Sequence, residues 1–229
     1  MTTEKKPKRR RVSKKSEKEE AATGPAPQIY IVDPLASRSS EPKPRRVYLY
    51  GDVEEERAAE VVSALLTLRD SGREEVYENP DDPESPVKEV VYQPIDFYIS
   101  SFGGSAMDMF SIYDIMREVK ESCNISTVGL GKVMSAGVLL LAAGTKGYRR
   151  IAKNCRVMIH SVAGGQWGPI HNLENEMEEI RWLQQQYTKA IVSETNMSER
   201  YLKKLLNRKV NVYLSAEEAV EYGIADEIY

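Results

Sequence analysis

The segment GLGKVMSAGVLLLAAG, from Gly129 to Gly144, constrains the fold of this chain more than any other. It predicts a strand end, a glycine-bracketed turn and then a buried helix, because the apolar run after the turn is too continuous to face solvent. Ser135 lies at this turn, where its hydroxyl can be aimed outward near the positive end of the helix dipole. Ser135 is therefore either the N-cap of a core helix or a nucleophile, and this segment alone favours the N-cap.

Strand and helix patterns alternate from residue 46 to the end of the chain. The runs VYLYGDV, IDFYIS, STVGLG and CRVMIH are typical of strands, and helical patterns lie between and after them. Such alternation predicts one α/β domain over residues 46–229, with a mainly parallel sheet covered by helices. Residues 73–94 interrupt the pattern with acidic residues and prolines, so we expect an exposed insertion there, containing a hairpin built from EEVYE and KEVVY.

Two helical runs have apolar residues at helical spacing. The run after IDFYIS is expected to form a helix with Phe110, Tyr113, Met116 and Val119 on its inner side. The long run after the glycine-rich AGGQWGP segment has Leu173, Met177, Ile180, Leu183, Tyr187 and Ile191 on one side. Core packing alone would explain both patterns.

The N-terminal region differs in composition from the rest. Residues 1–27 are polar and charged and predict a disordered arm, and residues 28–45 predict a linker or a docking segment. Residues 1–20 hold nine lysines and arginines against four acidic residues, a net charge near +5, which leaves about −8 for the remainder of a chain with net charge −3. An acidic folded part argues against nucleic acid as a partner.

Composition also limits the compartment and the cofactors. No apolar run is long enough to span a bilayer, and the arm has no apolar secretory core, so we expect a soluble cytoplasmic protein without membrane contact. The two cysteines, Cys123 and Cys155, lack metal-ligand spacing, and only two histidines occur. We therefore expect neither a disulfide framework nor a metal, and no cofactor.

Acyl transfer requires a nucleophile, a base, a group that orients the base and donors for the oxyanion. Ser135 and His160 both follow predicted parallel strands, whose carboxyl ends gather at one edge of an α/β sheet. Gly103 and Gly104 end the preceding strand, where the backbone of a glycine can approach a substrate closely. The N–H of Ala136 would be a second donor. The glycines also fit a tight turn, and both interpretations can hold together.

Several motifs in this order resemble the proteolytic subunit of the Clp protease, a serine peptidase with a crotonase-like fold. They are the SFGG turn, SIYDIM, GKVMSAGVLLLAAGTKG, RVMIH and YLSAEEAVEYGIADEI, and the resemblance extends over residues 47–228. It implies that Ser135 is the nucleophile, His160 the general base, and Gly104 and Ala136 the oxyanion-hole donors. It also implies a long protruding helix.

The resemblance further implies that a glycine-rich loop binds the substrate as an added strand, which places Gly164 and Gly165 in the substrate-binding set. Gly103 of the SFGG turn joins them, because its backbone can approach a substrate closely. Two positions depart from the family pattern. The catalytic aspartate falls on Asn211, with Asn207 as an alternative, and Phe102 replaces a proline. An asparagine can accept the imidazole N–H but does not stabilise the imidazolium by charge, so we expect lower activity.

The resemblance implies a serine endopeptidase that degrades unfolded polypeptides by way of an acyl-enzyme on Ser135. It also implies a homo-oligomer of two stacked heptameric rings, joined by the long helix and fed by an ATP-driven unfoldase of the AAA+ class. The chain has no ATP-binding loop of its own.

Three other functions remain open: a catalytically silent ring subunit, a viral capsid-maturation protease, and an acyl-CoA enzyme of the crotonase fold. Two residues near the predicted site have simpler interpretations. Lys132 precedes Ser135 by three residues, which raises a Ser-Lys mechanism, but a solvated turn lysine is the simpler interpretation. His171 is expected at a surface or an interface rather than as a ligand.

Overall fold

The structure is a computed structural model that describes residues 44–79, 81–82, 84–165, 167–208 and 210–229. The predictions for the arm at 1–27 and for residues 28–43 lie outside the described residues. The described part is built around one sheet, in which the strands β1, β4, β5, β6 and β9 follow one another in that order. β7 pairs with β5 and also with β8.

Every pairing in this sheet is parallel except the one between β7 and β8, which is antiparallel. The mainly parallel sheet predicted from the alternating pattern is therefore confirmed. The strands are β1 (Arg46–Val53), β4 (Ile95–Gly104), β5 (Ile125–Met134), β6 (Arg149–Ile151), β7 (Arg156–Ile159), β8 (Val212–Leu214) and β9 (Glu227–Ile228).

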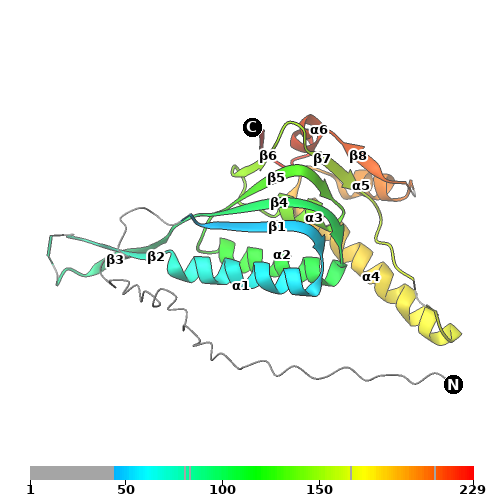
Figure 1. Cartoon of the computed structure of the whole chain (residues 1–229), viewed down its shortest axis with the longest axis horizontal. Coiled ribbons are helices and arrows are strands. Elements are labelled where there is room, and N and C mark those ends of the chain that lie inside the picture. Colours follow the sequence, from blue (N-terminus) through cyan, green and yellow to red (C-terminus); the bar gives the residue numbers. More distant parts are fainter. Residues whose placement is uncertain (1–43, 80, 83, 166, 209) are drawn as a thin grey trace, which may run out of the picture. The chain divides into compact units, whose positions relative to one another are not determined.

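Helices alternate with these strands and cover the sheet, as Figure 1 shows for α1 and α2 beneath β1 and β4. Along β1 the burial alternates: Val47 and Leu49 are buried under the helices, whereas Tyr48 and Tyr50 are exposed. A period of two is what a strand covered on one face produces. The helices are α1 (Glu55–Ser71), α2 (Ala106–Lys120), α3 (Ala136–Ala142), α4 (Ile170–Glu194), α5 (Glu199–Leu206) and α6 (Ala216–Glu221).

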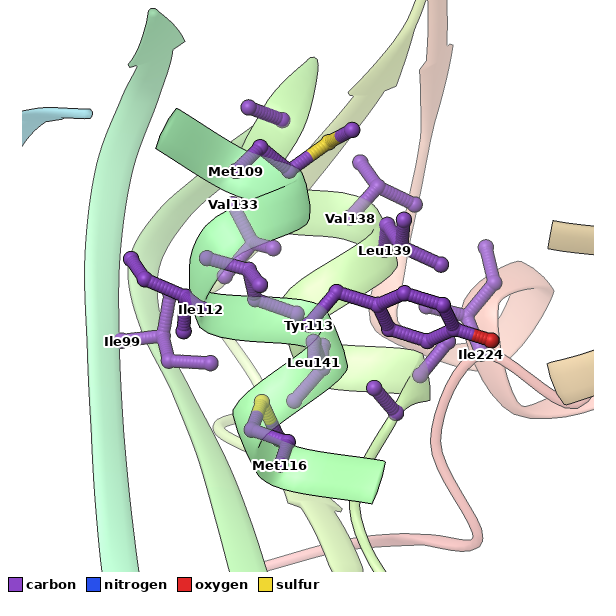
Figure 2. Packing of buried hydrophobic residues seen from close by; sticks show 14 of the residues in the cluster. Ile99, Met109, Ile112, Tyr113, Met116, Val133, Val138, Leu139, Leu141 and Ile224 are labelled. Carbon is purple, nitrogen blue, oxygen red and sulfur yellow. The ribbon is translucent and has the colours of Figure 1, made fainter. Parts of the chain in front are cut away.

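The core lies where α2 packs over α3 and the central strands, as the close view in Figure 2 shows. Tyr113, Met116 and Val119 are buried, as the helical spacing predicted. Phe110 is partly buried and packs against this core, so it also lies on the inner side, and Met109 adds to the buried residues of the helix. All seven residues of α3 are buried, as the continuous apolar run predicted.

The predicted hairpin within residues 73–94 is present. Strands β2 (Arg73–Tyr77) and β3 (Val87–Tyr92) pair antiparallel as a separate two-stranded sheet, with Arg73 opposite Tyr92. Most of their side chains are exposed. Gly72, which ends α1, and Pro94, just before β4, flank the hairpin, so it leaves the main sheet undisturbed.

Helix α4 has two different halves. Leu183, Tyr187 and Ile191 in its C-terminal half are buried against the domain. Leu173 and Met177 in its N-terminal half share their helical side but are exposed to solvent. The amphipathic pattern therefore reflects domain packing only in its second half. Among the described residues, no helix combines the length and the apolar character needed to cross a membrane.

Candidate active site

Ser135 occupies a sharp junction between the end of β5 at Met134 and the start of α3 at Ala136. Its backbone has φ 52° and ψ −118°, and it is the one non-glycine residue with positive φ among those described. A side chain in this region is strained and persists only where its surroundings fix it. Here the Ser135 N–H donates to the carbonyl oxygen of Met158 at 2.8 Å, and the Tyr187 hydroxyl donates to the Ser135 carbonyl at 3.2 Å.

The side chain of Ser135 makes no capping hydrogen bond to α3. Its Oγ instead lies 2.8 Å from Nε2 of His160. The hydroxyl is thus paired with a potential base, as expected for a nucleophile. The side chain of an N-cap would instead accept a hydrogen bond from a free N–H in the first turn of the helix.

Strand pairing explains how residues 25 positions apart in sequence meet. β5 and β7 are parallel with Met134 opposite Met158, so the residues that follow them emerge at the same sheet edge. His160 comes directly after β7 and is half-buried, which leaves its ring accessible from the cavity described below. The prediction that Ser135 and His160 meet at the carboxyl ends of parallel strands agrees with this geometry.

The third member of the predicted triad is not assembled in this structure. β8 runs antiparallel to β7 with Val212 opposite Ile159, and one more step in this register places Asn211 across from His160. The Asn211 side chain is exposed, however, and no described residue hydrogen-bonds to Nδ1 of His160. Asn207 ends α5 and lines a different surface hollow, with the basic residues of that helix.

The two predicted glycines lie against Ser135 and β1. Gly103 has φ +102°, and a Cβ there would lie 2.5 Å from Cβ of Ser135, so only glycine fits this close approach. The Gly103 N–H donates to Oγ of Ser101 at 2.9 Å and is therefore already satisfied within β4. Gly104, opposite Val53, borders the cavity together with Ala136, which leaves these two as the candidate donors for an oxyanion.

A cavity of about 490 Å³ opens beside the Ser135 hydroxyl. Most of its wall is apolar and comes from α2, α4 and the loop after β7. Gly164 belongs to this wall, whereas Gly165 lies in the same loop and does not line the cavity. The lining residues are Phe102, Gly104, Ser105, Ala106, Met107, Met109, Ser135, Ala136, His160, Val162, Ala163, Gly164, Glu176, Ile180, Leu183 and Tyr187.

Sequence reasoning did not assign Met107, Met109, Glu176 or Tyr187 to the site. The signal for Tyr187 was its position in the apolar stripe of α4, which core packing explained equally well. Tyr187 serves both purposes, because its ring is buried while its hydroxyl holds the Ser135 carbonyl. Burial also raises the pKa of Tyr187, so this phenol stays a neutral donor at neutral pH.

Lys132 and His171 lie outside the cavity wall. The Lys132 ammonium lies 4.6 Å from the ring centroid of Phe102, a cation–π contact, and forms no hydrogen bond with Ser135. His171 is exposed on α4, where its Nδ1 lies 3.4 Å from a carboxylate oxygen of Glu174. The ring of Phe102, at the position where the resemblance expects proline, is 61% exposed at the cavity edge.

Comparison with protein-family models adds an independent finding. The model described as Clp protease matches residues 88–229, which is more than half of the chain. The matched segment contains β4, the Ser135 turn, His160 and the whole of α4.

Proposed function

Because the chain belongs to the Clp protease family, we propose that it is a serine endopeptidase with Ser135 as nucleophile and His160 as general base. Membership of the family supports peptidase activity. The observation that carries the catalytic assignment is the 2.8 Å contact between Ser135 Oγ and His160 Nε2 at a strained strand-to-helix turn. Polypeptides are the proposed substrates.

In the proposed mechanism, neutral His160 accepts the hydroxyl proton as Ser135 Oγ attacks the carbonyl carbon of the peptide bond. The carbonyl oxygen becomes an oxyanion, to which the N–H groups of Gly104 and Ala136 donate. The imidazolium then gives its proton to the leaving amine, and the C–N bond breaks to leave an acyl-enzyme. Water attacks this ester, His160 takes its proton and returns it to Ser135, and the acid product leaves.

We propose Asn211 as the residue that orients His160. Its backbone position opposite His160, one step beyond the Ile159–Val212 pair, supports this assignment. A neutral orienter holds the tautomer without stabilising the imidazolium, so the proposed enzyme is slower than one with aspartate.

We also propose that the protein assembles into stacked heptameric rings and receives unfolded polypeptide from an ATP-driven unfoldase. The exposed apolar residues Ile170, Leu173 and Met177 at the start of α4 support assembly, because a second copy would remove them from water.

A second candidate function is a catalytically silent ring subunit. It is favoured by one observation, the absence of any hydrogen bond from the described residues to Nδ1 of His160. A freely rotating imidazole activates a serine poorly, because the general base must be aligned with the hydroxyl. A capsid-maturation protease would share the same chemistry and differ only in substrate.

A fluorophosphonate separates the active from the silent protein, because it modifies a serine only where a base and an oxyanion hole activate it. We expect intact-mass spectrometry to find a single adduct that maps to Ser135. The Ser135→Ala variant should give none. If the assembled wild-type protein forms no adduct at neutral or alkaline pH, the endopeptidase proposal is wrong and the silent subunit replaces it.

A further inference from the structure

Among the described residues of the cavity wall, one charged side chain is present besides the proposed base His160. Glu176 lines the cavity from α4 and is half-buried. Around it the wall is apolar, with Met107 and Met109 from α2 and Ile180 from α4. In a mainly apolar pocket, a charged group of this kind fixes the orientation of the bound group and gives specificity.

The position of Glu176 follows from helical periodicity. Glu176, Ile180, Leu183 and Tyr187 are spaced by four, three and four residues, so they form one stripe along α4. Tyr187 is the buried end of this stripe and bonds to the Ser135 carbonyl. Glu176 is at the opposite, more exposed end. The stripe therefore leads from the nucleophile, past apolar side chains, to a carboxylate.

The loop after β7 closes the cavity on the side facing this stripe. A Cβ added to Gly164 would lie 2.7 Å from Cδ1 of Ile180, so the loop backbone lies directly against α4. A substrate side chain that enters beside Ser135 would therefore lie among the apolar groups of a wall that Glu176 also lines. No lysine or arginine of the described residues lines this wall; Lys132 lies over the ring of Phe102, outside it.

We propose that Glu176 determines specificity by selecting a lysine or arginine on the acyl side of the scissile bond. The methylene stem of such a residue contacts the apolar wall, and its cationic end reaches the carboxylate. This inference rests on the proposed endopeptidase function and adds to it the class of side chain that the cavity takes.

Two peptidyl diphenyl phosphonates test the proposal, one with lysine and one with norleucine beside the phosphorus. Both probes modify an activated serine by forming an Oγ–P bond and releasing phenol. Their side chains have the same four-carbon stem, so the contribution of apolar contacts to the two rates cancels in their ratio. We expect the lysine probe to modify wild-type Ser135 about fivefold faster, the size expected for a partly exposed ion pair. Glu176→Gln should bring the ratio of the two rates to near one, and Glu176→Lys should favour norleucine.

Glu179→Gln is the matched control, because it removes the same charge from the exposed side of the same helix and does not touch the cavity. It should leave the rate ratio unchanged. An unchanged ratio in Glu176→Gln, or a ratio near one in the wild-type protein, would overturn the proposal.

A fluorophosphonate without a side chain separates this failure from that of the proposed function. If this fluorophosphonate labels Ser135 in both the wild-type and the Glu176→Gln protein, but the ratio of the lysine and norleucine rates is the same in both, only the specificity proposal is wrong. Absence of labelling in the wild-type protein removes both. Labelling of Ser135 in Glu176→Gln by this probe also shows that the variant is folded.

Discussion

The backbone of Ser135 is strained in a way that only its surroundings maintain, and this strain places the hydroxyl beside His160. Such strain is typical of functional sites, where it is offset by interactions elsewhere. We expect Ser135→Gly to be about 1 kcal/mol more stable than Ser135→Ala, because glycine adopts positive φ without a steric cost. Urea unfolding of the two inactive variants measures this difference. Equal stabilities would show that the turn is not strained.

Asn211 is the residue at which the chemistry of this site departs most from a complete triad. A carboxylate there would stabilise the imidazolium that forms as the serine attacks. We therefore expect Asn211→Asp to speed fluorophosphonate modification of Ser135 about tenfold or more, given the rate cost of an asparagine in a triad. Asn207→Asp is the control, since Asn207 lies at the end of α5 and lines another hollow. An effect of Asn207→Asp alone would transfer the role to that residue.

At the scale of elements, an ion pair between buried Arg149 and partly buried Asp226 fixes the chain end to the sheet that positions the site. The Arg149 guanidinium of β6 donates to both carboxylate oxygens of Asp226, and its Nη1 also donates to the carbonyl of Glu194 at the end of α4. Burial by itself would raise the pKa of Asp226, but hydrogen bonds from Arg149 and Gly147 outweigh it, and the pKa is lowered.

A lowered pKa in the folded state means that the unfolded state binds the proton more readily. The stabilisation from Asp226 is therefore complete well above the ordinary aspartate value of 3.8 and is lost as the pH falls through the lower folded-state pKa. We expect Asp226→Asn to cost about 3 kcal/mol at neutral pH, because it leaves buried Arg149 without its counter-charge. The loss should shrink in acid. Urea unfolding between pH 7 and pH 3 measures it, and a pH-independent loss would contradict the assignment.

The alternating elements explain which parts of the site the sequence could predict. Ser135 and His160 follow two parallel strands, so their meeting was accessible from pattern alone. Asn211 precedes a strand of three residues, where register and side-chain direction depend on tertiary packing. Glu176 is one of several glutamates on an amphipathic helix, and nothing local separates it from the exposed Glu178 and Glu179. Only the packing of α4 against the loop after β7 does so.

At the scale of the whole molecule, the described chain leaves the first half of α4 without a partner. Ile170 is 72% exposed and Met177 is 47% exposed, whereas Leu183, Tyr187 and Ile191 in the second half of the same helix are buried. Isolated exposed apolar residues are ordinary, but these continue the buried stripe of a single helix. The sequence pattern predicted the apolar stripe, but not the point along α4 at which it stops packing against its own domain. An apolar side chain that packs in the chain's own core and one that packs against a second protein give the same sequence pattern.

A second copy that covered this half of α4 would account for its composition, and the proposed stacked rings make that contact specific. We expect the double substitution of Leu173→Glu with Met177→Glu to stop the rings from stacking, since burying two carboxylates against apolar groups is unfavourable. Sedimentation velocity should then show an assembly of half the wild-type mass. Asn172→Glu is the control, because it adds charge at an exposed polar position of the same helix turn and should leave the mass unchanged. If the double variant keeps the wild-type mass, α4 does not join the rings, and its exposed stripe requires another partner.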